Sequence, residues 1–396
     1  MLTKRSDMFD ESLILDLTTR LSGLPKFALA QLPTPLHPLR NFGQLLNGPE
    51  LWMKRDDLSG LEGGGNKTRK LEFLTGDALG KGCDMLVTVG AIQSNHTRQT
   101  AAAAAKAGMK CALLHCAWTK DAGPNYRHVG NILLSHMLGA ELYIDETERP
   151  IEDQGPLEEF MAHLRAQGHR PYLIPGGASE HPLGSMGYMN CAIELAMQMQ
   201  RTGVFFDYLV HTTGSSSTQA GLVAGFKALG VPTKIIGIAD DGETAIKTRR
   251  VRELANEALA VLDLPELVGE NDVTVIASND ADYGYADDAI KEGIRLMATK
   301  EGLIADPVYE GRAIRGLLDM AAQNRFAPDA KILLMHLGGS PAVHAYAGQF
   351  GDIARPTTQI KSDKDALIAN GDQLNYQRAV PDMLRVEIQN RSLANG

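Results

Sequence analysis

Two loops of this chain carry residue types that together could hold and use a carbonyl cofactor. In the first, Glu62–Lys70, Lys67 follows three glycines and an asparagine and opens a helix-like run. Glycines let the backbone turn sharply and approach a ligand closely, and a lysine amine can form a Schiff base with a carbonyl group. The second loop, Thr212–Gly221, is rich in Ser, Thr and Gly and joins a strand-like run to a helix-like run. Backbone N–H groups at such a junction can bind a phosphate.

An imine-forming lysine and a separate phosphate loop are what pyridoxal phosphate requires, but two other interpretations of the first loop compete with this one. A nucleotide-binding P-loop needs the pattern Gly-x-x-x-x-Gly-Lys-Ser/Thr, whereas Asn66 separates the last glycine from Lys67. The bland interpretation is that Lys67 is a solvated lysine in an ordinary glycine turn. The single motif does not decide between this and a cofactor lysine, because short motifs match often by chance.

The bulk composition limits the class of protein and its partners. A length of 396 residues suits two domains, and 44% hydrophobic with 22% charged residues is typical of a globular protein. The net charge of −9 argues against nucleic acid or an anionic membrane as partner, and no apolar run reaches the length of a membrane span. The first thirty residues show no basic-then-apolar leader, so no secretory signal is expected.

The cysteines and histidines indicate a reducing environment and no structural metal. The four cysteines are sparse and have neither a Cys-x-x-Cys pair nor histidines at ligand spacing; they are Cys83, Cys111, Cys116 and Cys191. We expect buried free thiols in a cytoplasmic protein. The histidines are scattered along the chain, so we expect no metal site.

Strand-like and helix-like runs alternate along the chain. Two βαβ units are predicted. In the first, a helix at 97–106 connects the strands Met85–Val89 and Cys111–Leu114. In the second, a helix at 219–229 connects the strands Tyr208–His211 and Ile235–Ile238. A further strand is predicted at Ile332–Met335. Such alternation predicts parallel sheets covered by helices on both faces, and the spacing of the two units favours two α/β domains.

Polar residues follow several of these strands, where ligands bind in parallel sheets. Ser94 and Asn95 lie at the predicted start of a helix, where they could bind a carboxylate or simply cap the helix. Tyr309 and Glu310 follow a proline at a chain turn and could point into a cleft, although an exposed Tyr-Glu pair usually has no function. Tyr283 lies in a polar loop and could equally be a surface residue.

Seven stretches, in order and spread over residues 30 to 350, resemble the pyridoxal-phosphate (PLP) dependent family of 1-aminocyclopropane-1-carboxylate (ACC) deaminase and D-cysteine desulfhydrase. They are LPTPLHPL from Leu32, KRDDLSG from Lys54, GGGNKTRKLEFL from Gly63, GAIQSNHTRQTAAAAAKAGMKC from Gly90, TGSSSTQAGLVAGF from Thr213, DPVYEG from Asp306 and HLGGSPA from His336. The resemblance implies the tryptophan-synthase-β fold (fold type II): an α/β protein with two open, twisted, mostly parallel sheets, helices on both faces and PLP in the interdomain cleft. It further implies a larger discontinuous PLP domain (residues 1–79 and 181–352), a smaller βαβ domain (80–180) and a C-terminal extension (353–396).

The resemblance also implies roles for individual residues. Lys67 would form the imine with PLP, Asn95 would meet the ring hydroxyl and Glu310 the pyridine nitrogen. The phosphate would be held by Lys70 and by the loop of Thr213, Gly214, Ser215, Ser216, Ser217 and Thr218. Ser94 would meet the substrate carboxylate or move a proton. The other residues that would face the substrate are Asn95, His96, Trp118, Tyr283, Tyr309 and Leu337, with Tyr283 and Tyr309 also catalytic.

Two positions favour the deaminase within this family. At position 310 the resemblance is to the deaminases, which have glutamate there, whereas the desulfhydrases tend to have a neutral hydroxyl residue. A carboxylate stabilises the protonated pyridine ring and makes PLP a stronger electron sink, which ACC needs because its α-carbon has no proton to remove. Leu337 also resembles the deaminases. The resemblance therefore implies opening of ACC to 2-oxobutyrate and ammonia.

Three departures from the deaminase pattern leave the substrate open. His96 stands where the deaminases usually have glutamine, and the phosphate loop is longer, at Ser216 and Ser217. The chain also has the C-terminal extension. One alternative is a β-eliminating lyase, a D-cysteine desulfhydrase or cysteate sulfo-lyase, which gives pyruvate, ammonia and sulfide or sulfite. Another is a PLP-binding protein without catalysis. The resemblance implies a homodimer or higher homo-oligomer that acts on a small amino acid.

Overall fold

The computed structural model describes residues 10–119, 122–147, 155–241, 243–265, 267–277 and 283–351. The chain divides into two compact units, Met1–Tyr346 and Ala347–Gly396. Both sheets and all candidate site residues belong to the first unit. The predicted C-terminal extension, 353–396, lies outside the described residues. In the described ranges, no helix is both long enough and apolar enough to cross a membrane.

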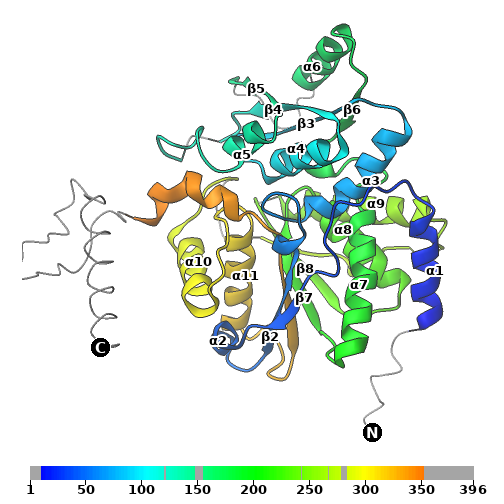
Figure 1. Ribbon diagram of the computed structural model, residues 1–396. Helices are drawn as coiled ribbons and strands as arrows, with labels where there is room; N and C mark the ends of the chain where they lie inside the picture. The colour runs from blue at the N-terminus through cyan, green and yellow to red at the C-terminus, as the bar shows by residue number, and fades with distance from the viewer. Residues whose placement is uncertain are drawn as a thin grey trace, which may run out of the picture. The chain divides into compact units, whose positions relative to one another are not determined.

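The described strands form two sheets (Figure 1). The six-stranded sheet has the order β1-β2-β10-β7-β8-β9; its strands are β1 (Leu36–Pro38), β2 (Glu50–Arg55), β7 (Tyr208–Thr213), β8 (Lys234–Ala239), β9 (Thr274–Ile276) and β10 (Lys331–His336). Its edge strand β1 runs antiparallel to β2, and the other pairs are parallel. The four-stranded sheet is parallel, with the order β5-β4-β3-β6; its strands are β3 (Met85–Ala91), β4 (Lys110–Cys116), β5 (Glu141–Asp145) and β6 (Pro171–Ile174).

Helices cover both faces of the six-stranded sheet. The α-helices are α1 (Glu11–Ser22), α2 (Arg40–Gly43), α3 (Lys67–Gly80), α4 (Asn95–Ala107), α5 (Asn131–Met137), α6 (Gly155–Ala166), α7 (Met186–Thr202), α8 (Ser217–Ala228), α9 (Thr244–Val261), α10 (Asp288–Glu301) and α11 (Glu310–Ala322). Short 3-10 segments are η2 (Gln44–Leu46), η3 (Asp56–Leu58), η4 (Gly176–Ala178), η5 (Glu270–Asp272) and η6 (Ser340–Phe350). Figure 1 shows α7 and α8 on one side of β7 and β8, and α10 and α11 on the other.

The four-stranded sheet is also covered on both faces, because successive side chains of a strand point in opposite directions. Met85, Val87 and Val89 of β3 share an apolar cluster with residues of α6. Leu86, between them, belongs to the large core cluster that contains Ala101 and other alanines of α4. The predicted α/β fold of mostly parallel sheets with helices on both faces is therefore confirmed.

The two predicted βαβ units are found as β3-α4-β4 and β7-α8-β8, and the predicted strand 332–335 is the centre of β10. The domain boundaries predicted at 79/80, 180/181 and 352/353 stay predictions. One expectation was wrong in part: Cys111, Cys116 and Cys191 are buried free thiols, but Cys83 is only half-buried. It lies in the turn just after α3 ends, where the chain runs over the surface.

Candidate functional site

The glycine loop before Lys67 is held tightly against the loop that follows β10. Gly65 has a φ of +120° and Gly338 a φ of +104°, and a Cβ on Gly338 would lie 2.6 Å from the Cα of Gly65. Both positions need glycine, for the positive φ and for the close approach. The N–H of Asn66 donates to the carbonyl oxygen of Leu337 at 2.8 Å. The contact fixes where α3 begins, at Lys67.

Lys67 and Lys70 lie one turn apart on α3, so their side chains share a face. Nζ of Lys70 donates to Oγ of Ser217 at 2.7 Å and to the carbonyl oxygen of Gly177 at 3.3 Å. Burial lowers the pKa of Lys67 to about 8, although the hydrogen bond with Lys70 and the charge of Asp240 act to raise it. Burial, together with the charge of Lys67, lowers the pKa of Lys70 well below its usual value. A neutral amine is thus accessible near physiological pH, as Schiff-base formation requires.

The predicted phosphate loop, 213–218, joins the end of β7 to the beginning of α8. Ser216 has a φ of +73° at this turn. Oγ1 of Thr213 is buried and, within the described part of the chain, has no hydrogen-bond partner. The first N–H groups of α8 lack intrahelical partners, as at every helix start, and the helix dipole there favours an anion. A phosphate fits this loop because it would satisfy the Thr213 hydroxyl, the helix N-terminus and the Lys70 amine together.

Two positions near Lys67 and the predicted phosphate loop need glycine, because neighbouring side chains approach the backbone there too closely for a Cβ. A Cβ at Gly177, in η4, would lie 2.4 Å from Oγ of Ser215 and 4.0 Å from Nζ of Lys67. A Cβ at Gly214 would lie 2.2 Å from Oδ2 of Asp240. The structure therefore brings the predicted lysine and the predicted phosphate loop into one site.

Ser94 and Asn95 lie where the four-stranded sheet meets α4. Oγ of Ser94 accepts the N–H of Thr97 at 3.3 Å, so Ser94 does cap the helix. Oδ1 of Asn95 accepts Nδ2 of Asn131 at 2.8 Å, which fixes the Asn95 side chain. Capping and ligand binding are compatible, because further N–H groups of the first turn stay available for a carboxylate.

His96 leaves one ring nitrogen without a partner. Its Nε2 lies 2.7 Å from the hydroxyl of Thr88. That hydroxyl donates its proton to the carbonyl oxygen of Ile174 at 2.7 Å, so Nε2 of His96 is the donor to Thr88. Nδ1 is buried and unpaired among the described residues. Burial, with the charges of Lys67 and Lys70, lowers the pKa of His96 well below its usual value, so the ring is neutral.

Tyr283 and Tyr309 form a pair. Their hydroxyl oxygens lie 2.7 Å apart and their rings meet edge to face. Oγ1 of Thr212, at the end of β7, donates to the carbonyl oxygen of Tyr309 at 2.5 Å. Oδ2 of Asp306 accepts the N–H of Tyr309 at 3.0 Å. Burial raises the pKa of both phenols, so both are neutral and able to donate a proton.

Glu310 is a buried carboxyl group whose surroundings favour its neutral form. Its Oε1 accepts the N–H of Leu337 at 3.0 Å, and Nδ1 of His336 lies 3.9 Å from its Oε2. Within the described residues, no lysine or arginine forms an ion pair with it. Burial raises its pKa well above the usual value, and Asp306 adds to this. A protonated ring nitrogen would supply the missing opposite charge.

Two predicted substrate residues also take part in apolar packing, and their role toward the substrate stays a prediction. Trp118 packs against the apolar cluster between the four-stranded sheet and α6. Leu337 contributes its backbone N–H and carbonyl to the site, while its side chain belongs to the large core cluster. Sequence reasoning also missed Asp240 and its partner Lys247, for which the only signal was their place after strand β8.

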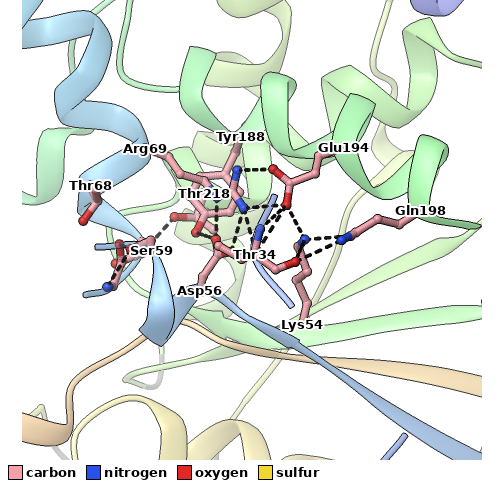
Figure 2. A network of polar contacts seen from close by, with 12 residues as sticks. Thr34, Lys54, Asp56, Ser59, Thr68, Arg69, Tyr188, Glu194, Gln198 and Thr218 are labelled. Atoms are coloured by element: carbon pink, nitrogen blue, oxygen red, sulfur yellow. Dashed lines mark hydrogen bonds and ion pairs between the residues drawn. The ribbon is translucent and has the colours of Figure 1, made fainter. Parts of the chain in front are cut away.

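A buried polar network anchors α3 from its other side (Figure 2). Arg69 is two residues from Lys67, hence on a different face of the helix. Its guanidinium donates twice to Asp56, at 2.8 Å each, and also to Glu194. Lys54 pairs with Glu194 as well. Burial acts to raise the pKa of Asp56, but the charge and hydrogen bonds of Arg69, the charge of Lys54 and the hydrogen bond from Tyr188 together lower it to about 2.

Comparison with known proteins identifies the family. Residues 27–338 match the pyridoxal-phosphate dependent enzyme family. A protein from Burkholderia vietnamiensis named 1-aminocyclopropane-1-carboxylate deaminase is 43% identical over 336 residues, covering 84% of this chain and 99% of that one. One of the same name from Burkholderia ambifaria is 43% identical over 334 residues, covering 83% and 98%.

Solved structures agree with this result. A crystal structure described as that of the ACC deaminase homologue has a TM-score of 0.77 and 34% identity, covering 85% of this chain and 98% of that one. O-ureido-L-serine synthase, with a TM-score of 0.60 and 15% identity over 81% and 93% of the two chains, shares the fold. The resemblance predicted from the sequence is confirmed: the chain belongs to the pyridoxal-phosphate-dependent enzymes of fold type II, in the group that contains the 1-aminocyclopropane-1-carboxylate deaminases.

Proposed function

We propose that this enzyme opens the three-membered ring of ACC and, with one water molecule, releases 2-oxobutyrate and ammonia. The observation that carries the proposal is Glu310, a buried carboxyl group without a cationic partner among the described residues, at the position where the family resemblance places the cofactor's ring nitrogen. A carboxylate there favours a protonated ring and hence strong withdrawal of electrons. The 43% identity to curated ACC deaminases supports the same substrate.

Five groups of this chain would hold the cofactor. Lys67 would link to its aldehyde, Lys70 and the loop 213–218 would bind its phosphate, Asn95 its ring hydroxyl and Glu310 its ring nitrogen. When bound, PLP supplies an electron sink for the substrate's α-carbon. Glu310 would lose its proton on meeting the ring nitrogen, because the opposite charge offsets the cost of burying a carboxylate.

The remaining residues orient the substrate and move protons. Ser94 and Asn95, at the N-terminus of α4, would bind the substrate carboxylate, with the helix dipole contributing. The α-carbon of ACC has no hydrogen, so the proton has to move at a ring methylene. The Lys67 amine, with its lowered pKa, suits that transfer. Tyr309, held by Tyr283, would act on the ring carbon as proton donor or as nucleophile.

A substrate panel tests this proposal. Purified enzyme with PLP is incubated separately with ACC, D-cysteine and cysteate, and 2-oxo acid, ammonia, sulfide and sulfite are measured. We expect 2-oxobutyrate and ammonia from ACC. Sulfide from D-cysteine or sulfite from cysteate, without turnover of ACC, would identify a β-eliminating lyase instead. A protein that binds PLP but releases no 2-oxo acid from any of the three would be a non-catalytic binder.

Two further expectations accompany the proposal. The predicted homodimer, or a higher homo-oligomer, would appear as a mass above 42.8 kDa in light scattering. The predicted cytoplasmic location would be checked by fractionating cells that produce the protein.

A further inference from the structure

The fold places a buried carboxyl group directly against the phosphate loop. Asp240 follows β8, which runs parallel to β7, so the two strands end side by side. The N–H of Asp240 donates to the carbonyl oxygen of Thr213 at 3.2 Å. Its side chain lies over Gly214: a Cβ there would be only 2.2 Å from Oδ2 of Asp240. A negative group thus lies beside the loop that is meant to receive an anion.

Lys247, from α9, is paired with this carboxyl group. Its Nζ lies 3.0 Å from Oδ1 of Asp240 and 2.8 Å from Oδ2 of Asp241. It also donates to the carbonyl oxygen of Gly214 at 3.5 Å. The side chains of Lys247 and Asp240 are 11% and 7% exposed, against 33% for Asp241. One nearly buried ammonium therefore contacts both the carboxyl group and the phosphate loop.

The charges around the loop would oppose phosphate binding without this lysine. Two negative groups a few ångströms apart repel strongly in a buried site. Burial raises the pKa of Asp240, whereas the charge of Lys247 acts to keep it ionised. Lys70, the other cation at the loop, has its pKa lowered well below the usual value by burial and by Lys67. Lys247 is left charged, since Asp240 and Asp241 together raise its pKa against the effect of burial.

We propose that Lys247 is a positioning residue of the phosphate site that acts through Asp240: it neutralises the carboxylate beside Gly214 so that the loop 213–218 can accept a phosphate group. This inference rests on the proposed cofactor site. It assigns Lys247 no contact with the substrate or with the reacting atoms.

The test compares the affinity of the apoprotein for PLP with its affinity for pyridoxal, which lacks the phosphate, by equilibrium dialysis. We expect Lys247→Met to weaken PLP binding about tenfold or more, because an uncompensated charge remains beside the phosphate. Pyridoxal binding should change by less than about twofold. Asp240→Asn should leave PLP binding equal or tighter. The double variant should recover affinity to within about threefold of the wild type, because neither charge remains.

Other outcomes overturn the inference in distinguishable ways. A double variant as weak as Lys247→Met would mean that Lys247 binds the phosphate itself. An equal loss of pyridoxal affinity would mean general damage to the site. Weaker PLP binding by Asp240→Asn would contradict the repulsion, and this variant and the double variant decide the matter even if Lys247→Met does not fold. Lys227→Met, which removes the exposed pair with Asp272 from α8, is the matched control and should bind PLP normally. A wild type that binds neither compound would overturn the proposed function instead.

Discussion

The buried ionisable groups on the two faces of α3 differ in whether they have a partner of opposite charge. On one face, Arg69 has two carboxylate partners, Asp56 and Glu194. On the other face, Lys67 lies next to a second lysine, and Glu310 across the site has no cationic partner among the described residues. The pKa values diverge accordingly: those of Asp56 and Arg69 move toward the charged forms, and those of Lys67 and Glu310 toward the neutral forms.

Burial is common to both faces, so the presence of a partner makes the difference. A buried charge with a partner stays ionised and holds the fold in one arrangement. A buried ionisable group without one becomes neutral and ready to react or to receive an opposite charge, as functional sites require. The network around Arg69 thus fixes α3, and the groups on the other face are left for ligands to complete.

The largest effect is expected from a change on the face of α3 that carries Lys67. Lys67→Ala removes the amine that would bind the aldehyde and move the proton, so we expect turnover of ACC to fall by about 10³-fold or more. The visible absorbance band of lysine-bound cofactor should also disappear. Lys81→Ala, at the exposed end of the same helix, should change neither. An unaltered spectrum in Lys67→Ala would contradict the assignment.

The next largest effect is expected from a change on the opposite face of α3, where Arg69 is paired with carboxylates. Arg69→Met leaves Asp56 buried without its ion-pair partner and leaves Glu194 with Lys54 alone. We expect the free energy of unfolding to fall by about 3–5 kcal/mol in urea titrations. The exposed pair of Arg249 and Glu253 provides the control, because Arg249→Met should cost less than about 0.5 kcal/mol. Similar losses in the two variants would show that the network does not stabilise the fold.

A smaller effect separates activity from stability. Glu310→Gln replaces a neutral buried carboxyl group by a neutral amide of the same shape. We expect turnover of ACC to drop about 10²-fold, because the ring nitrogen loses its carboxylate. At about pH 4, where this carboxyl group is largely protonated in the unfolded chain as well, the free energy of unfolding of the apoprotein should stay within about 1 kcal/mol of the wild type. Full activity would show that pairing with the ring nitrogen has no role here.

The smallest effect is a difference in acid stability. The pKa of Asp56 falls from 3.8 to about 2 on folding, so its contribution is complete above pH 4 and is lost as the pH falls through 2. The shift corresponds to about 2 kcal/mol. Acid titration of Asp56→Asn should lack this loss between pH 4 and 2. The pKa of Glu310 is raised, so its ionisation instead costs stability as the pH rises, and Glu310→Gln should remove that cost. Identical curves of unfolding free energy against pH, from acid to neutral, in the wild type and both variants would contradict the contrast between the two faces.

The sequence predicted what is encoded locally. The glycines before Lys67, the Ser/Thr-rich loop and the alternation of strands and helices are each visible in short windows. Strand β2 was missed because Lys54 and Arg55 interrupt its apolar pattern, although Lys54 is fully buried. Asp240 was missed because only the pairing of β7 with β8 brings it to the phosphate loop. That Trp118 packs against the apolar cluster of β3 and α6 likewise depends on tertiary contacts that no local pattern reports.

The backbone carbonyl and N–H of Leu337 set the distance between two parts of the candidate site. Its carbonyl fixes Asn66, next to the lysine proposed to bind the cofactor, and its N–H fixes Glu310. The separation between the residues proposed for the aldehyde and for the ring nitrogen is therefore set by main-chain atoms, which every non-proline residue supplies. Evolution or an engineer can exchange the aliphatic side chain at this position for another of similar volume while that separation is inherited unchanged.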